Sequence, residues 1–143
     1  MKDVVITGLG MLTPLGVGVE QNWHSILNNQ SGIRPIQHLD AQKIRAKVCG
    51  RIWDYDANKH FDIKQQRRFD PFIQYGVVAC REALQDANIS KDTVMQIDPY
   101  RVGVAVGSGI GGIQNIENQH HAVLQNCPSR ISPFFVPGTI SNM

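Results

Sequence analysis

The sequence has 143 residues, which suits one domain or one part of a larger domain. Hydrophobic residues make up 42% and charged residues 18%, as in an ordinary globular protein, and no apolar run approaches the roughly 20 residues that span a bilayer. The short apolar runs therefore give no reason to expect a membrane partner. The net charge of +2 is too small to indicate a nucleic-acid-binding protein, so nucleic acid is not expected as a partner either.

The first third of the chain is predicted to hold two strands and a helix. Residues 3–7 form a β-branched run closed by a Gly-Leu-Gly turn, which is typical of a buried strand. Residues 19–29 predict a helix with one apolar face, ended by the Gln-Ser-Gly sequence at 30–32. Residues 34–46 look irregular, and residues 47–53 predict a short strand.

The longest predicted helix covers residues 69–87. Pro71 stands in its first turn, where a proline fits, and Asn88 is expected to stop it. Its apolar stripe consists of Ile73, Val77, Cys80, Leu84 and Ala87. The breadth of the apolar face indicates packing on more than one side.

A second strand and helix follow. Residues 101–106 predict a buried strand that ends in a glycine-rich turn at 107–112, and a helix is expected from about 113 to 125. Residues 132–137 are aromatic and flanked by proline, which predicts an extended segment. The order strand, helix, strand, helix favours an α/β layered fold.

The two glycine-rich turns do not match nucleotide-binding motifs. A dinucleotide turn needs glycine or alanine where this chain has Thr13, and Pro14 follows it. After the turn at 107–112, Ile113 and Gln114 stand where a P-loop needs Lys and Ser or Thr. A dinucleotide site is therefore disfavoured. The turn at 107–112 is interpreted either as a flexible connection or as a mobile loop beside a ligand.

Five blocks in order along the chain resemble the β-ketoacyl-acyl-carrier-protein synthases. They are residues 4–16 (VVITGLGMLTPLG), 30–33 (QSGI), 72–76 (FIQYG), 107–112 (GSGIGG) and 131–137 (ISPFFVP). The last two are especially similar to the type II elongating enzymes of bacterial fatty-acid synthesis. One glycine-rich match would be weak, but ordered blocks over the whole chain are specific.

The resemblance implies the thiolase-like layered fold, helix/sheet/helix/sheet/helix, in a homodimer when full length. It also implies a decarboxylating Claisen condensation. A cysteine takes the acyl chain from acyl carrier protein as a thioester, and malonyl-carrier loses carbon dioxide and attacks that thioester. Two histidines and backbone amides stabilise the developing charge. The implied partners are acyl- and malonyl-loaded acyl carrier protein, with no cofactor and no metal.

In this family the catalytic cysteine and histidines lie beyond the last matching block. We therefore expect residues 1–143 to be the amino-terminal part of a synthase domain, truncated before the cysteine. Only part of the first half of the fold would be present, with no catalytic residue and no activity of its own. The alternative is a non-catalytic or degenerate synthase-like partner that docks carrier protein or dimerises without making a thioester.

The cysteines and histidines of the chain receive no catalytic role. Cys80 lies on a predicted apolar stripe and is interpreted as a core residue, and Cys49 and Cys127 match nothing catalytic in the family. Their odd number and wide spacing argue against disulfides or zinc, and with no signal peptide they predict a cytoplasmic protein. His120 and His121 are adjacent, so they cannot easily hold one metal ion together.

Two residues receive a pocket role through the resemblance. Ile110 matches the family's residue that gates the acyl pocket, and its glycine neighbours would let the loop shift. Phe135 matches an aromatic residue that reaches the pocket from across the dimer interface. Simple core packing is the alternative interpretation of both.

A basic cluster matches the family's docking patch for acyl carrier protein. Its members are Lys64, Arg67, Arg68 and, later in the chain, Arg130. Acyl carrier protein is acidic, so basic side chains would speed encounter and fix orientation. An ordinary solvated run of charges is the alternative.

Overall fold

The chain forms two compact units, which are described one after the other. The computed structural model describes residues 3–37, 43–125, 129 and 131–141. Unit 1 comprises Met1–Asp56 and Val78–Ile89, and unit 2 comprises Ala57–Val77 and Ser90–Met143. The long helix α3 (Pro71–Asp86) contributes residues to both units.

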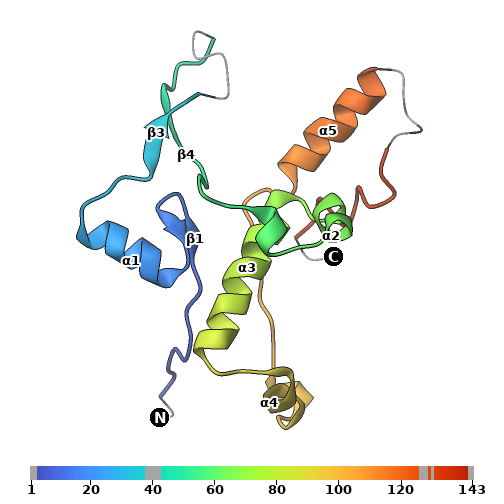
Figure 1. Ribbon diagram of the computed structural model, residues 1–143. Helices are drawn as coiled ribbons and strands as arrows, with labels where there is room; N and C mark the ends of the chain where they lie inside the picture. The colour runs from blue at the N-terminus through green and yellow to red at the C-terminus, as the bar shows by residue number, and fades with distance from the viewer. Residues whose placement is uncertain (1–2, 38–42, 126–128, 130, 142–143) are drawn as a thin grey trace. The chain divides into compact units, whose positions relative to one another are not determined.

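The described residues of unit 1 form two short antiparallel strand pairs and one helix besides the unit's part of α3 (Figure 1). Its elements are β1 (Leu12–Thr13), β2 (Gly16–Val17), α1 (Val19–Leu27), β3 (Ile33–Pro35) and β4 (Val48–Gly50). The short strand predicted at 47–53 is confirmed as β4. The start of the stretch interpreted as irregular pairs with it instead, since Arg34 lies opposite Cys49.

Helix α1 ends in a left-handed turn before the predicted glycine. Asn29 has φ 52°, and its N–H donates to the Ile26 carbonyl at 3.0 Å. The N–H of Gln30 donates to the Ser25 carbonyl at 2.9 Å. These bonds satisfy two of the last carbonyls of the helix, and asparagine adopts this conformation at little cost. The helix therefore ends at Leu27.

The interior of unit 1 is polar around α1. Asn22 is fully buried, and its side-chain amide donates to the carbonyls of Gly16 at 3.0 Å and Gly18 at 2.7 Å. It also accepts a hydrogen bond from the Thr13 hydroxyl. The buried side of α1 is thus the side that carries Asn22, whereas its apolar residue Trp23 lies exposed.

Helix α3 is slightly shorter at both ends than the predicted range 69–87, and it stops before Asn88 as expected. Pro71 is its first residue. Asn88 has φ 55°, and its N–H donates to the Gln85 carbonyl at 3.0 Å. The N–H of Ile89 donates to the Leu84 carbonyl at 2.9 Å, which completes a Schellman motif.

The predicted apolar stripe of α3 is not buried as a whole. None of its five residues is buried, although Val78 beside it is. Cys80 is exposed, so its interpretation as a core residue is wrong. The first segment of the chain approaches another side of the helix. A Cβ atom on Gly10 would collide with the carbonyl oxygen of Ala79, which lies about 100° around the helix from Cys80.

Glu82 of α3 fastens two other segments of unit 1. Its Oε2 accepts from the Met11 N–H at 2.8 Å, and its Oε1 accepts from the Val19 N–H at 2.7 Å. Val19 begins α1, and the capping residue Gly18 has no side chain to satisfy that donor. One carboxylate therefore caps α1 and holds the segment before β1.

Unit 2 is helical. Its elements are η1 (Ala57–Lys59), α2 (Ile63–Arg68), the start of α3, α4 (Lys91–Met95), η2 (Pro99–Arg101) and α5 (Ile113–Leu124). The helix predicted at 113–125 is confirmed as α5. Phe61 is the buried apolar residue of its first part, and its ring meets that of Phe69 edge-on, with centroids 5.8 Å apart.

The two strands predicted at 3–7 and 101–106 are not formed. Among the described residues, neither segment pairs with a strand, and Val4 and Val104 are 97% and 88% exposed. A β-strand exists only with hydrogen bonds from a neighbouring strand, and the local sequence cannot supply that neighbour. Along the described stretches, none of the helices has the length and apolar character needed to cross a membrane.

Candidate functional site

The basic residues predicted to dock a carrier protein lie on the short helix α2. Asp62 caps this helix, accepting from the Gln65 N–H at 2.8 Å, while the Gln65 side chain accepts from the Asp62 N–H at 3.1 Å. This capping box starts the helix at a defined residue. The helix ends at Arg68, where its negative dipole end favours cations.

The structure brings three of the four predicted docking residues together. Lys64 lies three positions before Arg67 and four before Arg68 on α2, so the three side chains fall within about 100° of the helix surface, and all three are exposed. The Arg68 guanidinium lies over the ring of Phe134, 4.6 Å from its centroid. Arg130 lies outside the described residues.

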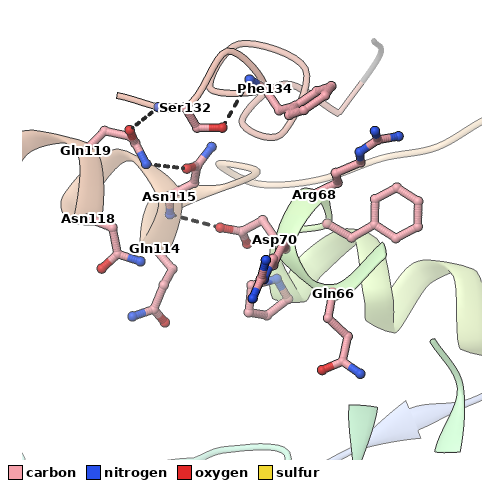
Figure 2. Close-up of a pocket in the computed structure, with 12 residues that line it drawn as sticks. Gln66, Arg68, Asp70, Gln114, Asn115, Asn118, Gln119, Ser132 and Phe134 are labelled. Atoms are coloured by element: carbon pink, nitrogen blue, oxygen red, sulfur yellow. Dashed lines mark hydrogen bonds between the residues drawn. The ribbon is translucent and has the colours of Figure 1, made fainter. Parts of the chain in front are cut away.

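A hollow of about 230 Å³ adjoins this cluster in unit 2. The junction of α2 and α3, the first turns of α5 and the turn at 132–134 line it (Figure 2). Its polar side chains include Arg68, Asp70, Asn115 and Gln119. The lining is therefore rich in hydrogen-bonding groups and carries both signs of charge.

The predicted gate residue Ile110 lies in an exposed turn before α5. Ile110 is 71% exposed, and the Gly111 N–H next to it donates to the Ser108 hydroxyl at 3.0 Å. Gly111 has φ 86°, a conformation that favours glycine. A Cβ atom on Gly107 or Gly109 would meet only open space, so one side of the turn is uncrowded.

The segment that carries Phe135 is a series of tight turns, so the prediction of an extended segment at 132–137 is wrong. The Phe135 N–H donates to the Ser132 carbonyl at 3.0 Å, and the Gly138 N–H donates to the Phe134 carbonyl at 2.9 Å. The hydroxyl of Thr139 donates to the Phe135 carbonyl at 2.6 Å. These bonds coil the backbone, because each residue finds its acceptor three or four positions back.

Asn115 ties this coiled segment to α5. Its side-chain amide donates to the Phe135 carbonyl and to the Thr139 hydroxyl, both at 3.1 Å. One turn later, Gln119 accepts from the Ser132 N–H at 2.8 Å (Figure 2). The Gly112 N–H donates to the Thr139 carbonyl at 2.9 Å. The segments that carry Ile110 and Phe135 are therefore joined by hydrogen bonds at the first turns of α5.

Asp70, Asn115 and Gln119 organise this region and were not singled out from the sequence. An Asp-Pro pair at the start of a helix signals a capping residue, and that signal was available at Asp70. Its bond to Asn115, 45 residues away, has no local signature.

The cysteines and histidines form no metal centre in the part of the chain that the structure describes. The rings of His120 and His121 lie 6.4 Å apart, tilted by 47°. Cys49 is half-buried on β4, and Cys127 lies outside the described residues.

Solved ketosynthases have a similar fold. The ishigamide ketosynthase/chain length factor matches with a TM-score of 0.72 and 22% identity, over 96% of this chain and 34% of that one. A type II polyketide synthase ketosynthase, solved in complex with its acyl-carrier protein and bound to the hexaketide, matches with a TM-score of 0.70 and 25% identity, over 98% of this chain and 35% of that one. These similarities confirm the thiolase-like fold class.

The sequence comparison defines the family. The model described as "Beta-ketoacyl synthase, N-terminal domain" matches residues 1–143, and the chain belongs to this family. It is 44% identical to 3-oxoacyl-[acyl-carrier-protein] synthase 2 of Vibrio harveyi, 40% to that of Coxiella burnetii and 39% to that of Staphylococcus aureus. Each match covers 99% of this chain and 34% of the relative, so the chain spans about one third of these relatives.

Proposed function

We propose that the chain is the amino-terminal part of a 3-oxoacyl-[acyl-carrier-protein] synthase of type II fatty-acid biosynthesis. The observation that carries this proposal is the identity of 39% to 44%, over 142 residues, with synthases of that name. The reaction is a decarboxylating Claisen condensation of malonyl-carrier with an enzyme-bound acyl thioester. In this proposal the nucleophilic cysteine and the two histidines lie outside residues 1–143.

In this synthase the chain would shape the acyl pocket through Ile110 and Phe135. The uncrowded, glycine-rich turn around Ile110 supports a gate, because it gives the turn room to shift as an acyl chain enters. Phe135 would reach the pocket from a second copy in a homodimer. Its placement on a segment fixed by Asn115 supports a defined position for its ring.

The chain would also receive acyl carrier protein. The exposed cations Lys64, Arg67 and Arg68 on one side of α2 support this role, because an acidic partner is steered by such a cluster. Arg130 would extend the cluster. The synthase would act in the cytoplasm, where its cysteines stay reduced.

The test is to isolate the polypeptide that contains these residues from its own cell. Mass spectrometry should show a polypeptide longer than 143 residues. With acyl- and malonyl-loaded carrier protein it should release carbon dioxide and form 3-oxoacyl-carrier. A 143-residue product that binds carrier protein but forms no thioester would contradict the proposal and support a non-catalytic partner.

A further inference from the structure

One carboxylate in unit 2 meets the first turns of two helices. Asp70 stands directly before α3, and its Oδ1 accepts from the Phe72 N–H at 3.4 Å. Its Oδ2 accepts from the Asn115 N–H, in the first turn of α5, at 2.9 Å (Figure 2). Asp70 therefore caps its own helix and, more tightly, a helix that begins more than forty residues later.

The first turn of α5 is capped by Asp70, which lies outside this helix. Its own capping residue is Gly112, which has no side chain to accept from the free N–H groups of the first turn. A carboxylate at this end also interacts favourably with the positive end of the helix dipole. Among the hydrogen bonds that the described residues make, the one from the Asn115 N–H to Asp70 is the side-chain cap of α5.

The same carboxylate lies against the end of the glycine-rich turn. A Cβ atom on Gly112 would lie 3.3 Å from the Cγ of Asp70 and would collide with the carbonyl oxygen of Gly138. The Gly112 N–H is meanwhile bound to Thr139. Asp70 and the 138–139 backbone therefore both crowd the position that a Cβ atom on Gly112 would take, two residues after Ile110.

We propose that Asp70 is a positioning residue that fixes the turn at 107–112, and with it Ile110, by clamping the start of α5 to the start of α3. The consequence for acyl-chain selection rests on the proposed function. Without the clamp, the first turn of α5 frays and the turn before it samples wider positions. The gate then distinguishes long acyl chains from short ones less well.

The test uses three variants of the full-length protein that contains these residues. Asp70→Ser keeps a short capping oxygen for α3 but cannot reach α5. Asp70→Asn keeps one acceptor oxygen that reaches the Asn115 N–H. Asp86→Ser is the matched control, because Asp86 lies at the opposite end of α3 and its carboxylate accepts from the Leu9 N–H, also at 2.9 Å.

The first measurement is amide hydrogen exchange at residues 112–116. Losing a hydrogen bond to a charged acceptor should speed exchange there roughly tenfold in Asp70→Ser. Asp70→Asn should stay near the wild-type rate, and Asp86→Ser should leave this segment unchanged. Equal exchange in Asp70→Ser and wild type would overturn the proposal.

The second measurement is the ratio of kcat/KM for a long and a short acyl-carrier. This ratio should move toward one in Asp70→Ser, and Asp70→Asn and Asp86→Ser should keep it near wild type. If Asp70→Ser speeds amide exchange at residues 112–116 but leaves the kcat/KM ratio unaltered, the claim that Asp70 positions Ile110 is overturned. If the wild-type protein elongates no acyl chain while the exchange contrast is present, the proposed function fails and the clamp stands.

Discussion

Single polar side chains hold segments of this protein together, some neighbouring and some far apart in sequence. Asn22 bonds to the nearby carbonyls of Gly16 and Gly18, whereas Glu82 reaches two distant backbone amides of unit 1 and Asp70 reaches α5. Gln74 is buried and donates to the Phe69 carbonyl at 2.8 Å. Buried polar groups keep their place only with such partners, because an unpaired one costs about 1–3 kcal/mol.

Changing Ile110 to Phe should narrow the range of acyl chains that the synthase accepts. If Ile110 gates the acyl pocket as proposed, a larger side chain there costs about 1–3 kcal/mol where it overfills the space, so kcat/KM for the longest acyl-carriers should fall roughly tenfold. Product chain length measures the effect. Ile97→Phe, at another exposed position of unit 2, is the control. An unaltered product profile in Ile110→Phe would contradict the gate.

At the scale of single residues, the family resemblance assigned roles to several residues. The sequence did not predict which residues contact each other. Lys64, Arg67 and Arg68 stand out by charge alone, and the structure places them on one exposed side. The burial of Cys80 was predicted wrongly because an apolar stripe identifies the apolar side of a helix. It does not identify the side against which other segments pack. Asp70 was missed because its second partner is distant in sequence.

At the scale of elements, the longer helices α1, α3 and α5 were predicted and the short helices α2 and α4 were not, and of the strands in the described residues only β4 was predicted. The limits of α3 are set by Pro71 and Asn88, which act on their immediate neighbours. The pairing of β3 with β4 joins residues 33–35 to 48–50, and no local pattern specifies such a partner. The turns at 132–139 escaped prediction for the same reason, since Asn115 of α5 helps to hold them.

Removing the carboxylate of Glu82 should destabilise unit 1. Glu82→Ala leaves the N–H groups of Met11 and Val19 without their acceptor and uncaps α1. The expected loss is about 1–3 kcal/mol in the free energy of unfolding, measured by urea denaturation of the full-length protein. Glu117→Ala on the exposed surface of α5 is the control and should change stability by less than about 0.5 kcal/mol. Equal losses in both variants would show that Glu82 is not a special fastening point.

At the scale of the whole molecule, the fold class was predicted from the order of the five family-like sequence blocks along the chain. Five glycine- or proline-containing motifs predicted a thiolase-like fold, and the similarity to solved ketosynthases confirms it. The division into two units that share α3 was not predicted, because it depends on contacts summed over the chain. The layers of sheet expected from residues 3–7 and 101–106 require strand partners that periodicity cannot identify.

Association with an acidic carrier protein is a property of the molecular surface and tests the basic cluster on α2. Arg68→Glu changes the charge at this cluster by two units, which replaces attraction of the carrier by repulsion. We expect KM for acyl-carrier to rise roughly tenfold, mainly through slower association, while kcat changes little. The dependence of KM on salt should weaken, since screening acts on fewer favourable pairs.

Lys91→Glu supplies the matched control for this electrostatic argument. Lys91 is an exposed cation on α4, so its replacement changes the net charge of the molecule by the same amount at a different helix. If docking depends on α2, Lys91→Glu should leave KM within about twofold of wild type. Equal increases in KM would mean that overall charge, rather than this cluster, attracts the carrier. An unchanged KM in Arg68→Glu would remove Arg68 from the docking surface and leave its contact with Phe134 as its structural role.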